Sequence, residues 1–151
     1  MTPRRLDWQI VRPKLREIER LLTVLESLEP IDVALLEQDV RTELAVERVL
    51  TLLVELAFSV NGHVGAAHLG RSPDSYADSF ALAAEAGAIG ADLAARLRPA
   101  AATRTVLVHA YLETDRTTVA AAVPRAVEDF TDYRRQVASW FTSTPGAGHE
   151  T

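Results

Sequence analysis

Apolar residues recur at helical spacing along almost the whole chain. Near the start they fall every three or four positions from Val11 to Leu25, on one face of a helix expected to run to about Ser27. Pro13 lies near the first turn of this helix, where a missing N–H does least harm. The repeat spans too few heptads to favour a coiled coil, so the pattern predicts a bundle helix.

A second helical pattern follows the break at Glu29–Pro30 and runs from residue 33 to about residue 64, with a kink expected near Gln38. Asp32 is placed to cap it. Its second half carries a broad apolar stripe and little polar surface, which predicts the central helix of a bundle. Glu55 interrupts that stripe. Because a buried carboxylate must be paired or neutralised, we expect Glu55 either to meet a basic partner, the commoner outcome, or to face a cleft.

Three more helices are predicted in the rest of the chain. A short one should span residues 76 to about 86, and the next should begin near residue 91. Pro99 should kink or restart that helix, and Pro124 should restart the last one, which Thr114–Asp115 caps. The GxxG spacing of Gly87 and Gly90 also occurs in phosphate-clamping loops, but helix punctuation is the favoured interpretation.

The chain is predicted to be all-α, an antiparallel bundle of about five helices in a single domain. Its 151 residues suffice for one core, and the sequence shows neither strand signals nor internal repeats. We expect the bundle to occupy residues 1–141 and a flexible C-terminal tail to occupy residues 142–151. With no cysteine, disulfides, thiol nucleophiles and cysteine-based zinc sites are excluded.

The first residues lack the apolar region of a signal peptide. The longest apolar run, residues 49–60, is twelve residues long and contains Glu55, so it is too short to span a bilayer. The expected location is therefore the cytoplasm, away from the membrane.

Charge is unevenly distributed along the chain. The net charge is −5, which argues against general nucleic-acid binding, since phosphate affinity comes from clustered Lys and Arg. Residues 93–112 nevertheless hold Arg96, Arg98, Arg104 and His109 and not one carboxylate. A local basic pocket of this kind fits a confined phosphate site.

The sequence Arg104-Thr105-Val106-Leu107-Val108-His109-Ala110-Tyr111 resembles the R-x4-H-x-Y motif of HEPN-domain toxins of the HepT type. The similarity covers roughly residues 6–141. Further similar stretches are residues 45–50, 75–80, 84–87, 94–97 and 129–130. The resemblance implies a HEPN-like fold and a metal-independent endoribonuclease that needs no cofactor and acts as a homodimer with facing motif helices.

The resemblance also assigns roles to single residues and names a partner. Arg104 and His109 would be the nuclease pair. The local basic charge, rather than the resemblance, suggests Arg96 and Arg98 as weak RNA contacts. The expected partner is a minimal nucleotidyltransferase antitoxin of the MNT type, which would silence the toxin by transferring AMP to Tyr111. Family members usually have Asn or Asp after the motif arginine, where this chain has Thr105.

The motif also makes chemical sense without the family. Metal-free RNA cleavage needs proton transfer at the 2′-hydroxyl and at the leaving oxygen, which histidine can supply near neutral pH. Arginine stays charged and can grip phosphate oxygens. Arg104 and His109 are about 140° apart around a regular helix, and one chain has one motif histidine. A two-fold dimer would supply two histidines and allow pairing across subunits.

Simpler interpretations remain for several of these residues. Without the family resemblance, the simplest interpretation of His109 is a hydrogen-bonded core histidine, and that of Tyr111 is an aromatic residue at a helix end. His63, His68 and His109 match no metal-binding spacing, so no metal is expected. The alternative function is a non-catalytic helical subunit that binds a minimal nucleotidyltransferase; Thr105 favours this alternative, whereas the intact motif favours the nuclease.

Overall fold

The protein is a bundle of α-helices, as predicted. The computed structural model describes residues 5–109 and 115–144. None of these described residues is in a β-strand. The helices are α1 (Trp8–Leu28), α2 (Val33–Gln38), α3 (Val40–Val64), α4 (Tyr76–Ala86), α5 (Ala91–His109) and α6 (Arg116–Ser143), with a π-helical turn, η1 (Gly65–Leu69), directly after α3. Within the described ranges this is one α-helix more than predicted, because the expected second helix is divided.

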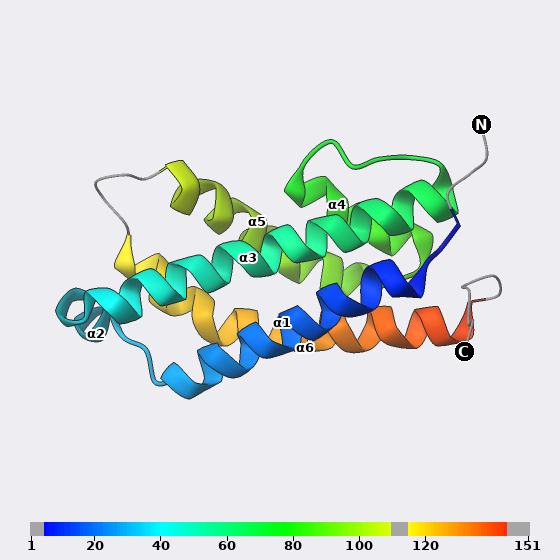
Figure 1. Ribbon diagram of the computed structural model, residues 1–151. Coiled ribbons are helices and arrows are strands. Elements are labelled where there is room, and N and C mark those ends of the chain that lie inside the picture. Colours follow the sequence, from blue (N-terminus) through cyan, green and yellow to red (C-terminus); the bar gives the residue numbers. More distant parts are fainter. Residues whose placement is uncertain (1–4, 110–114, 145–151) are drawn as a thin grey trace.

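Helix α3 is the centre of the bundle. It packs against α1, α4, α5 and α6, and Figure 1 shows it running along the length of the molecule between these helices. Its apolar stripe is buried, from Val46 to Val64. By length and composition, the stretch Val40–Leu69 could cross a membrane, but 61% of its most apolar window is buried inside the protein, as in a core helix. The predicted central helix is confirmed.

Side-chain caps explain most of the helix starts. Asp7, Asp32 and Asp115 accept backbone N–H groups in the first turns of α1, α2 and α6. The kink expected near Gln38 is a full break, because Asp39 accepts the N–H groups of the next helix and restarts the chain as α3. Gly87 ends α4 with a φ of +90°, a conformation that glycine adopts without strain. The GxxG stretch is therefore helix punctuation.

The predicted restart at Pro124 is wrong, and α5 does not restart at Pro99 either; the kink that was the other outcome expected at Pro99 stays a prediction. Helix α5 continues through Pro99 and α6 continues through Pro124. Both proline rings lie on exposed sides of their helices, while Leu97 and Ala101 around the first, and Val123 and Ala126 around the second, are buried. Packing of these flanking turns holds each helix together across the backbone hydrogen bond that proline cannot make.

A buried polar network joins three helices. The hydroxyl of Tyr133 (α6) donates to Asn61 Oδ1 (α3) at 2.6 Å, and Asn61 Nδ2 donates to Ser79 Oγ (α4) at 3.1 Å. All three residues are buried. Because buried polar groups left without partners are destabilising, the network fixes α4 and α6 against the middle of α3.

The turn after α3 also packs closely against α4. A Cβ atom on Gly65 would overlap the Leu82 side chain and come within 2.9 Å of the backbone oxygen of Arg71. On Gly62, a Cβ atom would meet only Pro73 Cδ, at 3.9 Å. Gly65 therefore permits a close approach of η1 to α4 that another residue would prevent.

Candidate active site on helix α5

Arg104 points into the bundle and is largely but not fully buried. Its Nη2 donates to Glu55 Oε1 on α3 at 3.0 Å. Its guanidinium carbon lies 4.2 Å from the centre of the Tyr76 ring, at the start of α4. The Arg104 side chain is 17% exposed and that of Glu55 is 34% exposed. Of the two outcomes expected for Glu55, the structure shows the basic partner.

Three helices thus build the surroundings of Arg104. The Tyr76 ring packs on Phe58 of α3, with ring centres 4.6 Å apart, and Ser75 caps the helix that Tyr76 begins. Arg104 Nε is buried and has no hydrogen-bond acceptor among the residues that the structure describes. The guanidinium is therefore held on one face by a ring and at one end by a carboxylate.

The basic pocket predicted for residues 93–112 is partly neutralised. Arg96 donates to Asp129 at 3.1 Å and to Asp132 at 3.0 Å, both on α6. With the Glu55–Arg104 pair, two of the three arginines meet carboxylates from other helices. Although residues 93–112 contain no carboxylate, carboxylates from the neighbouring helices α3 and α6 lie beside two of these arginines.

Arg98 keeps its charge on the surface. It is exposed and has no ion pair within the part of the chain that the structure describes. Together with Tyr76 and Thr105 it lines a shallow groove between the start of α4 and the middle of α5. This groove is the more open of the two hollows beside α5.

His109 is the last residue of α5 and is exposed. Helical rotation places it about 140° from Arg104, and Arg104 points toward α3, so the two side chains are not brought together within one chain. Thr105 uses its hydroxyl locally, donating to the backbone oxygen of Ala101 at 3.2 Å. Tyr111 lies outside the described residues.

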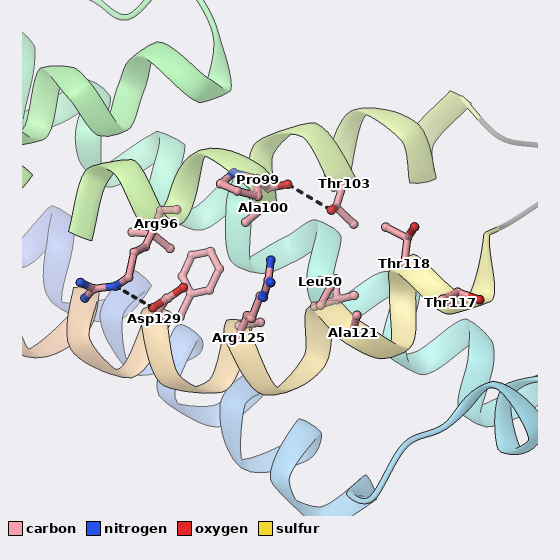
Figure 2. Close-up of a pocket in the computed structure, with 14 residues that line it drawn as sticks. Leu50, Arg96, Pro99, Ala100, Thr103, Thr117, Thr118, Ala121, Arg125 and Asp129 are labelled. Carbon is pink, nitrogen blue, oxygen red and sulfur yellow. Dashed lines mark hydrogen bonds and ion pairs between the residues drawn. The ribbon is translucent and has the colours of Figure 1, made fainter. Parts of the chain in front are cut away.

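A second hollow lies on the α6 side of α5. It is a cavity of about 330 Å³ whose walls come from α3, α5 and α6. Figure 2 shows Leu50 and Ala121 among its apolar lining, Thr103 and Thr118 at one end, and Arg125 rising from α6 toward α5. Sequence reasoning missed this cavity, because its lining residues come from three helices and share no sequence motif.

The other histidines have different surroundings. His63 is buried, and its Nε2 accepts the backbone N–H of Asp7 at 2.9 Å, which ties the start of α1 to the end of α3. His68 packs edge-on against Trp140, with ring centres 5.5 Å apart. Across residues 5–109 and 115–144, no group of three or more His, Cys, Asp or Glu side chains is placed to hold a metal ion.

Comparison with known proteins places this chain in a family. The sequence model of the Ribonuclease HepT-like family matches residues 8–137. No curated protein gives a significant match. The fold is similar to that of several solved structures, all under 25% identical in sequence.

Three of these structures illustrate the similarity. A toxin–antitoxin crystal structure with AMP-PNP shares 23% identity, with 87% of this chain and 98% of that chain covered and a TM-score of 0.77. The tri-AMPylated HEPN toxin of Shewanella oneidensis, in complex with the MNT antitoxin, shares 24% identity over 86% of this chain and 97% of that chain, with a TM-score of 0.76. The cytosolic protein YutE of Bacillus subtilis, of unknown function, shares 20% identity over 91% of this chain and 92% of that chain, with a TM-score of 0.77.

The fold agrees with these all-helical structures over nearly their full length. The family match spans α1 to α5 and most of α6, and the resemblance drawn from the motif is thereby confirmed. The chain belongs to the Ribonuclease HepT-like family.

Proposed function

We propose that this protein is the toxin of a toxin–antitoxin pair and a metal-independent endoribonuclease. The observation that carries the proposal is an intact Arg104 and His109 pair at the end of α5 in a chain of the HepT-like family. Arg104 would bind the scissile phosphate and stabilise charge on it. His109 would move protons between the 2′-hydroxyl, the leaving oxygen and water. The reaction would take place in the cytoplasm, where RNA is available.

The proposed active form is a homodimer. Two features support it: the different directions of Arg104 and His109 in one chain, and the exposed apolar side chains beside His109. Val106 is 56% exposed and Val108 is 37% exposed. A second copy is one way to bury apolar side chains that a single chain leaves exposed. A second copy packed on the end of α5 would cover both valines and bring a second His109 to the site.

RNA would reach the site along α5. Arg98 is the better of the two predicted RNA contacts, because it is exposed and unpaired among the described side chains, whereas Arg96 already meets Asp129 and Asp132. Phosphate contacts of this kind are independent of sequence and weaken with salt. We therefore assign RNA affinity mainly to Arg98 and only weakly to Arg96.

The proposed antitoxin is an MNT-type nucleotidyltransferase that transfers AMP to Tyr111. Support comes from the solved relatives, one of which is an AMPylated toxin with its MNT antitoxin. An AMP group two residues beyond His109 would bring a bulky anion to the site and exclude RNA by volume and by charge. The other tyrosines are poorer candidates, because Tyr133 is fully buried and the Tyr76 ring is half-buried in contacts with Arg104 and Phe58.

Mass spectrometry tests the modification. After coexpression with the neighbouring nucleotidyltransferase, the intact wild-type chain should gain mass in units of AMP, and Tyr111→Phe should gain none. Peptide mapping should place the added mass on Tyr111. Modification of Tyr133, or full modification of Tyr111→Phe, would refute this assignment.

Growth arrest tests the toxin activity itself. Expression without the partner should stop growth of the host, and His109→Ala should abolish the arrest. His68→Ala is the matched control, since His68 is exposed and packs on Trp140 at the other end of the molecule. The alternative, a non-catalytic partner subunit, is favoured by Thr105 and predicts normal growth with all three chains.

A further inference from the structure

Arg104 is held more tightly than a phosphate-binding arginine at a surface needs to be. Glu55 accepts one of its N–H groups, Tyr76 covers one face, and Nε is buried without an acceptor among the described residues. A buried N–H with no partner is unfavourable. The surroundings therefore fix this side chain in one place despite an unsatisfied donor.

The two groups that hold Arg104 are themselves fixed. Glu55 lies midway along the central helix, between the buried residues Val54 and Ala57. Tyr76 begins α4, a helix that Ser75 caps and that the Asn61–Ser79 hydrogen bond attaches to α3. Neither group is on a loop. Both can therefore define the position of a third side chain to the precision that catalysis requires.

Glu55 leaves much of the guanidinium free. Arginine has five N–H donors in a planar fork; Glu55 takes one on Nη2, and Nε is inaccessible. The remaining donors are those of the outer end, and 17% of the side chain stays exposed. An ionised carboxylate beside the guanidinium also stabilises its charge inside the bundle. The arrangement holds the guanidinium at Nη2 and on one face of its plane, while its other Nη donors have no hydrogen bond among the described residues and remain for an anion.

We propose that Glu55 and Tyr76 are positioning residues for Arg104, which orient its outer N–H groups toward the scissile phosphate of the RNA. This inference rests on the proposed nuclease function and adds two residues to it. Glu55 acts as the anchor through its hydrogen bond, and Tyr76 acts as the platform through its ring. Neither residue touches the RNA.

Kinetics with a synthetic RNA oligonucleotide in EDTA test the anchor. Glu55→Ala should lower kcat by about 10- to 100-fold, because a misplacement of about 1 Å can cost ~10²-fold. Glu55→Gln should recover most of this loss, since its amide oxygen can accept the same hydrogen bond from Nη2. The matched control is Glu85→Ala, which breaks a surface ion pair with Arg71 away from α5 and should behave as wild type.

Other kinetic outcomes would overturn the inference. Equal losses in Glu55→Ala and Glu55→Gln would show that hydrogen-bonded positioning is not the role of Glu55. Unchanged or faster cleavage in Glu55→Ala, or a lower KM, would show that the carboxylate competes with RNA for Arg104. If Glu55→Ala does not fold, the other two variants still test the inference. Glu55→Gln should keep most of the activity and Tyr76→Leu should lose most of it, and the opposite pattern would overturn the inference.

An NMR measurement without RNA tests separately whether Glu55 and Tyr76 immobilise Arg104, an arrangement called the clamp below. The Nε–H signal of Arg104, identified by its disappearance in Arg104→Lys, should exchange slowly with water in the wild type and in Glu55→Gln. It should exchange fast in Glu55→Ala and Tyr76→Leu. Fast exchange in the wild type would refute the clamp even if RNA is cleaved. A wild type that cleaves no RNA would refute the nuclease function and the positioning role together, even if slow exchange shows that the clamp exists.

Discussion

Replacing Tyr133 by phenylalanine tests whether the network behind the site holds the bundle together. Tyr133 is fully buried, and its hydroxyl donates to Asn61 Oδ1 at 2.6 Å. In Tyr133→Phe the ring keeps its packing against Phe80 and Phe130, while Asn61 Oδ1 loses this donor inside the protein. The hydroxyl also approaches the Ala57 carbonyl oxygen at 3.3 Å, so the substitution removes both hydrogen bonds of this hydroxyl and leaves the apolar core around it unchanged.

The expected loss of stability follows from that geometry. Leaving a buried acceptor unsatisfied costs ~1–3 kcal/mol. For a domain of this size each kcal/mol lowers the melting temperature by about 2–4 °C, so the expected decrease is about 2–12 °C. Urea unfolding should show a lower midpoint with an unchanged slope. Tyr76→Phe is the control and should stay within ~0.5 kcal/mol of wild type, because no hydrogen bond of its hydroxyl is found among the described residues.

Alkaline pH gives an independent measurement of the same group. Burial raises the pKa of Tyr133 far above its ordinary value, so the folded protein disfavours the ionised form. Because the unfolded chain ionises this tyrosine more readily, the free energy of unfolding is unaffected by it below the unfolded pKa of about 10. Above that pH the free energy of unfolding falls, by at most ~1.4 kcal/mol per pH unit. Tyr133→Phe should lack this part of the alkaline decrease. Equal stability of Tyr133→Phe and wild type, or a tyrosinate absorbance change from Tyr133 near pH 10 in the folded protein, would refute the reasoning.

Two further predictions concern assembly and packing. If each site needs only Arg104 of one chain and His109 of the other, an equal mixture of Arg104→Ala and His109→Ala should recover up to about a quarter of wild-type cleavage, since half of the dimers would hold one such pair. Sizing and activity assays on the mixture check this; no recovery would indicate that a site needs both histidines, and a fully active monomer would contradict the dimer. Gly65→Ala should destabilise the protein by ~1–3 kcal/mol through overpacking against α4, whereas Gly62→Ala should stabilise it by up to ~1 kcal/mol through helix propensity; urea unfolding checks both, and a Gly65→Ala variant as stable as wild type would contradict the close approach.

The helices could be predicted because their signals are local. The apolar spacing of α1, the boundaries of α4 and the cap at Asp115 all depend on residues within a few positions of one another. The sequence mispredicts a restart at Pro124 for the opposite reason. Its local effect is to break a helix, but the buried residues on either side hold α6 together, and that packing is a property of the folded bundle.

The motif marks the candidate site, but it does not predict the electrostatics around it. The sequence marks Arg104 as a phosphate ligand and Glu55 as a carboxylate that needs a partner, yet these two residues are 49 positions apart. Arg96 and Asp129 are 33 positions apart. Ion pairs between helices depend on the rotation of each helix about its axis and on which helices become neighbours. A carboxylate-free stretch of sequence therefore does not establish a basic pocket.

Cleavage of single-stranded RNA by the purified chain in EDTA tests the central proposal most directly. The wild type should cleave without added metal, and Arg104→Ala and His109→Ala should each lose most of the activity, by ~10²–10⁴ for the histidine as a positioned proton-transfer group. Both variants should keep the helical circular dichroism of the wild type. Absence of cleavage by the wild type, or unchanged cleavage by both variants, would contradict the assignment of this site as a ribonuclease.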